Sequence, residues 1–238
     1  LELAYVGTRY SGFQIQDNAN SIQEEVEKAL LIFFKNKIDL TGSSRTDAGV
    51  HALQNFFHFD YDLEISSSIV YNLNAILPQD IVIKNVFKVN ENAHSRFDAT
   101  HRTYQYFITS TKNPFLLERA WFFPFKLDTE LLHECANDVL QNRNFEAFCK
   151  TGTQVNNFIC TISESFWYYD EARNCWIYTV KGNRFLRGMV KALVSTMVLV
   201  ARGKKTKEEF GQLLLNTANK KADFTAPSHG LFLCNVDF

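Results

Sequence analysis

The stretch "TGSSRTDAGVHA", residues 41–52, joins two apolar segments and places Arg45 and Asp47 in a loop of small polar residues. Aspartate and glycine are favoured turn residues, so one interpretation is a plain turn in which Asp47 caps the local backbone. The other interpretation is a carboxylate held out of the loop for chemistry. Taken alone, the residues of this loop favour the turn, so the choice depends on the rest of the chain.

The segments on either side of this loop predict one supersecondary unit. Ser21 and Glu24 have the spacing of a capping box, and apolar residues follow them at helical spacing. The predicted elements of this N-terminal part are strand 1–5, helix 22–33, strand 38–40, strand 50–59, helix 68–77 and strand 81–89. Their order is β-α-β-β-α-β.

The C-terminal part repeats this order. Its predicted elements are strand 104–109, a helix capped by Asp128, strands 158–169 and 176–181, helices 185–201 and 207–215, and strand 231–236. Two such units in series predict an α+β fold made of two ferredoxin-like halves, residues 1–95 and 96–238. Each half is expected to be a sheet with helices on one face.

The composition is that of a folded protein without strong overall charge. Of the 238 residues, 46% are hydrophobic and 14% aromatic, which supplies a core and excludes disorder as the main state. The formal net charge is −1, so no overall basicity indicates a nucleic-acid partner. Such a partner would have to be recognised by a local patch.

The five cysteines are dispersed and contain no C-x-x-C pair. This pattern favours reduced thiols in a cytoplasmic protein over a disulfide framework or a zinc site. The chain does not open with the pattern of a secretory signal, and its longest apolar run, residues 192–201, is too short to span a bilayer. No motif indicates a metal site, a P-loop, a dinucleotide site or a serine hydrolase.

Basic residues collect in two places. The acid-free segment 181–207 contains Lys181, Arg184, Arg187, Lys191, Arg202, Lys204, Lys205 and Lys207. The second group consists of His94, Arg96, His101 and Arg102. We expect Arg187 and Lys191 to share a helix face, because they are four residues apart. A charge run alone is usually a solvated face. Here aromatic residues interleave with the cations, which favours an RNA groove; they are Phe97, Tyr104, Tyr106 and Phe185.

Five stretches, in order, together resemble the TruA family of tRNA pseudouridine synthases and cover the chain nearly end to end. They are "LAYVGTRYSGFQIQ" (3–16), "SSRTDAGVHA" (43–52), "RFDATHRTYQY" (96–106), "GNRFLRGMVKALVSTM" (182–197) and "APSHGLFLCNVDF" (226–238). The resemblance implies a pseudouridine synthase fold, with a central, mostly antiparallel sheet, flanking helices and a positively charged cleft. It also implies a homodimer.

Carried over by position, the resemblance implies that Asp47 is the catalytic carboxylate and that Arg45 inserts where the target base has flipped out. Tyr104 would pack on the target uracil, and Lys191 would form an ion pair with Asp47. These roles have physical reasons. A base must leave the stack before its glycosidic bond can be attacked, and a nearby cation favours the charged form of a carboxylate.

The reaction implied by the resemblance is an isomerisation of uridine to pseudouridine, with no cofactor and no metal. The implied substrate is the anticodon arm of tRNA, at adjacent uridines on the 3′ side of the loop and stem (tRNA positions 38–40). Phosphates would be held by Arg96, Arg102, Arg184, Arg187, Lys204 and Lys205.

The chain departs from the family pattern at five positions: Val6 replaces an aspartate, Phe13 a tryptophan, Ser44 a glycine, Lys191 an arginine and Ser195 a glycine. Lysine keeps the charge of arginine but lacks its bidentate fork. The departures suggest a divergent paralogue, and they leave open an RNA-binding or RNA-folding protein without catalysis, or an isomerase of another RNA site. A carboxylate hydrolase is disfavoured, because no second acid at suitable spacing accompanies Asp47.

Overall fold

The computed structural model describes residues 1–62, 64–66, 68–152, 156–216 and 220–238. The chain divides into two compact units: unit 1 is Leu1–Thr100 with Phe232–Phe238, and unit 2 is His101–Leu231. The sequence analysis predicts the last strand within residues 96–238, whereas Phe232–Phe238 lie in unit 1. In the described part of the chain, every helix is too short or too polar to cross a membrane.

Unit 1 has the predicted β-α-β-β-α-β order. Its elements are β1 (Glu2–Tyr5), α1 (Ile22–Phe34), β2 (Thr41–Gly42), β3 (His51–His58), α2 (Ile69–Ile76) and β4 (Ile81–Asn85), with a 3-10 turn, η1 (Gly7–Arg9), after β1. Strand β1 pairs antiparallel with both β3 and β4, and β2 pairs antiparallel with β3. The resulting order β4-β1-β3-β2 is that of a split β-α-β, ferredoxin-like sheet.

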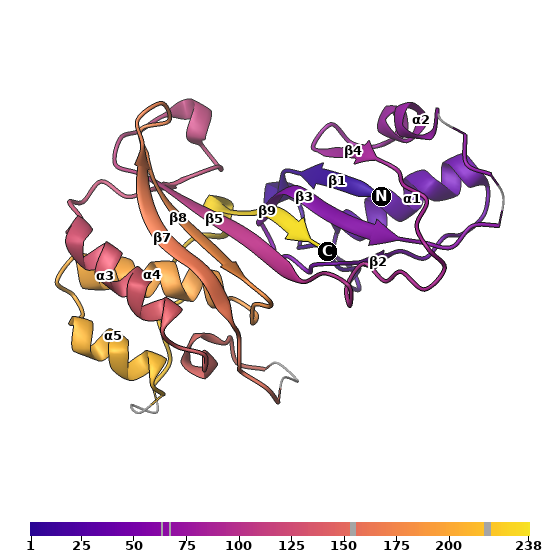
Figure 1. Ribbon diagram of the computed structural model, residues 1–238. Coiled ribbons are helices and arrows are strands. Elements are labelled where there is room, and N and C mark those ends of the chain that lie inside the picture. The colour runs from indigo at the N-terminus through magenta and orange to yellow at the C-terminus, as the bar shows by residue number, and fades with distance from the viewer. Residues whose placement is uncertain (63, 67, 153–155, 217–219) are drawn as a thin grey trace. The chain divides into compact units, whose positions relative to one another are not determined.

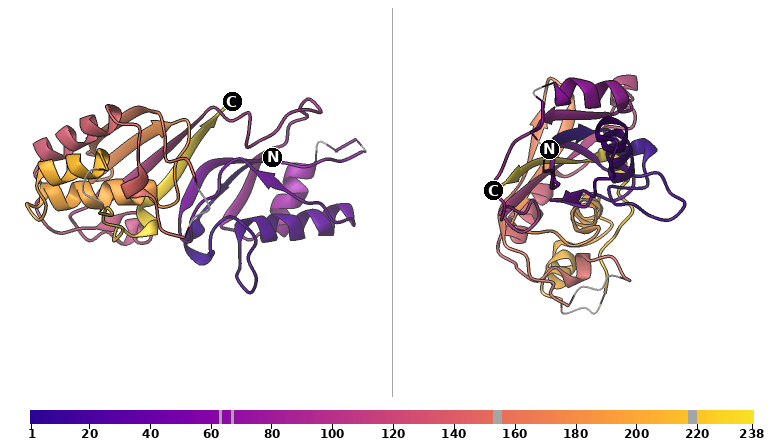
Figure 2. Two further views of the ribbon diagram at one scale, coloured as in Figure 1. Left: turned by 90° about the horizontal axis from the view of Figure 1, so that it is seen from below. Right: turned by 90° about the vertical axis from the view of Figure 1, so that its right-hand side faces the viewer.

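Strand β9 (Leu231–Asp237) pairs in parallel with β3, His51 lying opposite Phe232. This pairing explains why the C-terminal residues cluster with unit 1. Helix α1 begins where the sequence predicts, since the Ser21 side chain accepts a hydrogen bond from the Glu24 N–H. Helices α1 and α2 pack against each other on one side of the unit 1 strands (Figure 2).

The strands of unit 2 have helices on one face (Figure 1). Its elements are β5 (His101–Thr109), β6 (Trp121–Phe122), α3 (Thr129–Leu140), β7 (Ile162–Asp170), β8 (Cys175–Gly182), α4 (Met189–Ala201) and α5 (Lys207–Leu214), with the 3-10 turns η2 (Pro114–Leu116), η3 (Glu146–Phe148) and η4 (Ser228–Gly230). Strand β8 lies between β5 and β7 and is antiparallel to both. Trp167 of β7 faces the helices, and its Nε1 donates to Met197 Sδ of α4 at 3.5 Å.

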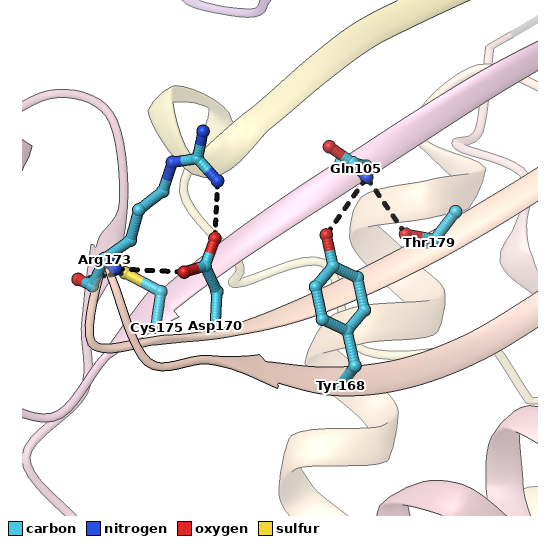
Figure 3. Close-up of polar contacts among 6 residues, drawn as sticks. All are labelled: Gln105, Tyr168, Asp170, Arg173, Cys175 and Thr179. Atoms are coloured by element: carbon cyan, nitrogen blue, oxygen red, sulfur yellow. Dashed lines mark hydrogen bonds and ion pairs between the residues drawn. The ribbon is translucent and has the colours of Figure 1, made fainter.

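The opposite face of this sheet carries polar contacts between strands (Figure 3). Gln105 Nε2 on β5 donates to Thr179 Oγ1 on β8 at 3.2 Å and to Tyr168 Oη on β7 at 3.4 Å. The amide of Gln105 thus links all three strands.

At the β7–β8 turn, the Arg173 N–H donates to the Asp170 carboxylate at 3.0 Å. That backbone bond and the Arg173 guanidinium lower the pKa of Asp170.

Three predicted elements begin three or four residues later in the structure than in the sequence analysis. The strand expected over 38–40 is wrong, because β2 occupies Thr41–Gly42. The helix expected over 185–201 begins at Met189, because Gly188 has φ +73°, which a helix does not contain. The strand expected over 158–169 begins at Ile162. Before it, the Cys160 N–H donates to the Arg143 carbonyl, so the chain there is bonded outside the sheet ladder.

Candidate active site

The residues expected at the active site are divided between the two units. Arg45 and Asp47 lie in unit 1, in the loop of residues 43–50 between β2 and β3, here called the Asp47 loop. Tyr104 on β5 and Lys191 on α4 lie in unit 2. Each pair is therefore described within its own unit, and the ion pair between Lys191 and Asp47 stays a prediction.

The Asp47 loop ends in a tight turn that main-chain atoms close. The Val50 N–H donates to the Asp47 carbonyl oxygen at 3.1 Å, and Gly49 has φ +77°. A type II turn requires a positive φ at this third position, which glycine adopts without strain. The turn is closed through the main-chain carbonyl of Asp47. Asp47 is half-buried and Arg45 is exposed.

A buried hydrogen-bond network fixes the start of this loop. The Tyr5 hydroxyl lies 2.9 Å from Thr46 Oγ1 and accepts a hydrogen bond from Asn55 Nδ2 at 3.2 Å. The amide of Asn55 is fully buried; it also donates to the Ser44 carbonyl at 3.0 Å and accepts from Ser43 Oγ at 2.8 Å. Burial raises the pKa of Tyr5 to about 12, so its hydroxyl stays protonated at neutral pH. Tyr5 and Asn55 are therefore positioning residues for the loop.

Main-chain contacts hold the same loop against the segment that follows η1. The Phe13 N–H donates to the Thr46 carbonyl at 3.1 Å, and the Gly49 N–H donates to the Tyr10 carbonyl at 3.3 Å. Gly12 has φ +109°, and a Cβ there would lie 2.9 Å from the Thr46 carbonyl oxygen. The glycine of "SGF" is thus required because the two backbones approach closely.

In unit 2, Tyr104 is packed in the sheet beside an aromatic neighbour. It is 8% exposed and lies opposite Val180 of β8. Its ring is nearly perpendicular to that of Phe185, with the ring centroids 5.1 Å apart. Two residues along β5, the Tyr106 hydroxyl donates to the Pro227 carbonyl at 2.8 Å, and burial raises the pKa of this tyrosine. These contacts fix the strand that carries Tyr104.

Lys191 lies in the first turn of α4 and is half-buried. Its Nζ donates to Ser228 Oγ, in η4, at 3.0 Å. One turn further along α4, Ser195 Oγ donates to the Asp223 carboxylate and lies 3.0 Å from Thr225 Oγ1. Burial raises the pKa of Asp223, but hydrogen bonds from Ser195 and Thr225 outweigh it and lower that pKa overall. Helix α4 is thereby bonded to residues 223–228 at two points.

Besides Lys191, two other residues that depart from the expected family pattern, Ser195 and Phe13, make defined packing contacts. Ser195 supplies a hydroxyl that bonds the segment leading to Ser228, a bond that a glycine cannot make. Phe13 stacks on Phe57, with the ring centroids 4.7 Å apart. Both residues take part in packing around the segments that carry Asp47 and Lys191.

The basic segment 181–207 is not one surface. Arg187 lies before Gly188 and outside α4, so the expectation that Arg187 and Lys191 share a helix face is wrong. Arg184 and Arg187 precede α4, whereas Lys204 and Lys205 follow it. A helix of 13 residues separates these two groups by about 20 Å.

Two other cations of this segment have partners within unit 2. Arg202 lies over the rings of Phe123 and Phe125, at 5.6 and 3.9 Å from their centroids. Lys207 Nζ is 2.7 Å from a carboxylate oxygen of Glu134. These contacts engage Arg202 and Lys207 within unit 2. Fewer cations of segment 181–207 are therefore available to an RNA groove than the sequence suggests. A role for Arg96, Arg102, Arg184, Arg187, Lys204 and Lys205 in RNA binding stays a prediction.

The sequence analysis missed three residues that support the candidate site, namely the buried Tyr5 and Asn55 and the half-buried Ser228. Asn55 could have been identified from the sequence, because it stands at a core-facing position of an apolar strand and a buried amide must find hydrogen-bond partners. Tyr5 and Ser228 carried no such signal, since their partners lie 41 and 37 residues away along the chain.

Comparisons with known proteins define the class of this protein. A family model described as tRNA pseudouridine synthase matches residues 3–98 and 142–238. These residues include the Asp47 loop and the segment of Lys191, while Tyr104 lies between the two matched ranges. The chain belongs to this tRNA pseudouridine synthase family, and the expected pseudouridine synthase fold is confirmed.

Individual relatives agree with the family match. The chain is 41% identical over 238 residues to tRNA pseudouridine synthase A of Bacteroides thetaiotaomicron, covering 99% of this chain and 88% of the relative. It is 36% identical to the protein of the same name from Parabacteroides distasonis, covering 99% and 94% of the two chains. The corresponding protein of Staphylococcus saprophyticus is 35% identical, with 98% and 88% covered.

Proposed function

We propose that this protein is a tRNA pseudouridine synthase that isomerises uridines in the anticodon arm and that Asp47 is its catalytic carboxylate. The observation that carries the proposal is the Asp47 loop itself. In a chain of this family, a half-buried aspartate follows a segment that Tyr5 and Asn55 fix by buried hydrogen bonds. A turn alone needs no such support, whereas a reacting group must be held in a defined geometry.

The chemistry assigns separate tasks to the four residues. In pseudouridine formation the bond between N1 of uracil and C1′ of ribose breaks, the base rotates, and a bond forms between C5 and C1′; C5 then loses its proton and N1 gains one, so the product is an isomer of uridine. The exposed Arg45 fills the gap left by the flipped nucleotide. Tyr104 supplies a flat face that retains the detached uracil. Lys191 is assigned the role of a cation that would favour the charged form of the Asp47 carboxylate. No step requires a cofactor.

We further infer that the protein is a cytoplasmic homodimer that binds tRNA through separate groups of cations. Arg184 and Arg187 before α4, and Lys204 and Lys205 after it, lie far enough apart to contact phosphates in different parts of one RNA arm. Light scattering of the purified protein tests the dimer, which predicts twice the mass of the 27.5 kDa chain.

The direct test is turnover. The protein is incubated with unmodified tRNA transcripts that carry uridines in the anticodon arm, and pseudouridine is mapped by position. The proposal predicts pseudouridine on the 3′ side of the anticodon loop and stem. Tight tRNA binding without any pseudouridine would favour the RNA-binding paralogue without catalysis. Pseudouridine confined to another RNA site would contradict the assigned substrate and keep the assigned reaction.

A further inference from the structure

Unit 1 exposes one of the aromatic residues that interleave with the cations, and no specific role has been assigned to it above. Phe97 follows β4 in a short loop of residues 94–98, here called the Phe97 loop, and its side chain is 74% exposed. A single exposed ring is common on protein surfaces. The contacts and hydrogen bonds that hold Phe97 in place are what indicate a binding role.

The Phe97 ring is one of a series of three rings in contact. His94 lies against Phe97 with the ring centroids 4.2 Å apart and the planes tilted by 35°, and His58 meets His94 edge-on, with the centroids 4.6 Å apart. The Arg96 guanidinium lies 5.8 Å from the Phe97 centroid, and Arg96 is exposed. The series therefore ends at the surface in an exposed aromatic ring with a guanidinium over it.

Hydrogen bonds hold this loop rigid. The N–H groups of Arg96 and Phe97 donate to His94 Nδ1 at 3.1 and 3.3 Å, and the His94 N–H donates to the Asp98 carboxylate at 2.7 Å. The buried Ser95 anchors the loop to β2, since its hydroxyl donates to the Thr41 carbonyl at 2.8 Å. The ring is thus pre-organised, so little entropy is lost when a ligand packs on it.

We propose that the Phe97 loop is a binding site for one unstacked RNA base, with Phe97 stacking on the base and Arg96 contacting its phosphate. The inference rests on the proposed function, because it takes tRNA as the ligand. A nucleotide presents a flat aromatic face and an adjacent negative charge, which match an exposed ring and an adjacent guanidinium. A purely apolar partner would make no use of Arg96.

The test measures the affinity for an unmodified tRNA transcript over a range of salt concentrations. Phe97→Ala is expected to raise Kd about tenfold and Phe97→Leu about fivefold, because leucine keeps apolar area but offers no flat face. Phe97→Tyr should bind within about twofold of the unaltered protein. The salt slope should be unchanged in the Phe97 variants and smaller by about one in Arg96→Gln, because only arginine contacts a phosphate.

A matched control comes from α2. Tyr71 is also an exposed aromatic residue of unit 1, at 77% exposure, and Tyr71→Leu should leave Kd unchanged. Normal tRNA affinity in Phe97→Leu would overturn the inference. So would a changed molecular mass of Phe97→Leu in light scattering, since the ring would then lie between copies of the chain. Pseudouridine formation by the unaltered protein is measured on the same tRNA transcript. If it occurs, a negative result for Phe97 overturns only this inference and leaves the proposed function standing.

Discussion

Replacing Tyr5 by phenylalanine should loosen the Asp47 loop without touching the substrate. The change removes one buried hydroxyl, which lies 2.9 Å from Thr46 Oγ1 and 3.2 Å from Asn55 Nδ2. Each lost hydrogen bond costs about 1 kcal/mol, so Tyr5→Phe should lower the free energy of unfolding by about 2 kcal/mol. For a chain of this length, that corresponds to a fall in Tm of about 4 to 8 °C.

A double-mutant cycle shows whether the bond between Tyr5 and Thr46 is the cause. Thr46→Val keeps the shape of the side chain and removes its hydroxyl, at an expected cost of about 1 kcal/mol. The double variant should lose about 2 kcal/mol and not about 3, because both single changes remove the same bond. The predicted coupling energy is therefore about 1 kcal/mol.

The assays are urea unfolding and pseudouridine formation on saturating tRNA. Since the network orients the residue next to Asp47, the same pair should be coupled in kcat, with kcat about tenfold lower in each single variant. The tRNA affinity should be unchanged, because neither side chain is expected to contact RNA. Additive unfolding energies, within about 0.3 kcal/mol, would refute the role given to this network.

Three further changes test other parts of the account. Gly12→Ala should destabilise the protein by about 2 kcal/mol in urea unfolding, because alanine is strained at φ +109°; normal stability would contradict the close approach of the two backbones. Burial and, secondly, the neighbouring His94 lower the pKa of His58 in the folded protein. The stability that neutral His58 contributes is therefore present above its ordinary pKa of 6.5 and is lost as pH falls through the lower folded pKa. A plot of Tm against pH should be flatter in His58→Gln than in the unaltered protein, and parallel curves would exclude this cause. Arg187→Gln and Lys204→Gln should each weaken tRNA binding and reduce the salt slope by about one; unchanged affinity and slope in both would remove these cations from the RNA interface.

The order of elements could be predicted because it depends on local patterns. Apolar residues recur at helical spacing after Ser21, and alternating strands flank the Asp47 loop, so the β-α-β-β-α-β order of unit 1 follows from nearby residues. The start of α4 could not be predicted in this way. Phe185 and Leu186 continue the apolar periodicity, and only the positive φ of Gly188 separates them from the helix.

Residues of the candidate site could be named from the sequence where one motif contains them. The contacts that support these residues could not be, because packing between distant segments forms them. Arg45 and Asp47 stand in a single motif, so the resemblance named them. The pairing of Tyr5 with Thr46, and of Lys191 with Ser228, depends on elements that meet only after folding. The placement of the last strand beside β3 is a similar case, because its parallel partner lies about 180 residues earlier in the chain.

The charge run shows how sequence proximity can mislead. Residues 181–207 contain no acid, yet Lys207 pairs with Glu134 and Arg202 stacks on Phe125, both from other parts of unit 2. Lys181 lies 4.0 Å from Glu164 on the neighbouring strand. Acids absent from a segment can therefore reach it from across the fold, and the charge available to RNA is smaller than the count suggests.

Asp47→Asn tests the central claim most directly, because it removes one negative charge and preserves the shape of the side chain. Rates of pseudouridine formation on saturating tRNA are compared with tRNA affinity and Tm for the same preparations. We predict a loss in kcat of about a thousandfold or more, with Kd within about twofold and Tm close to that of the unaltered protein. Pseudouridine formation at a comparable rate in Asp47→Asn would contradict the assignment of this carboxylate.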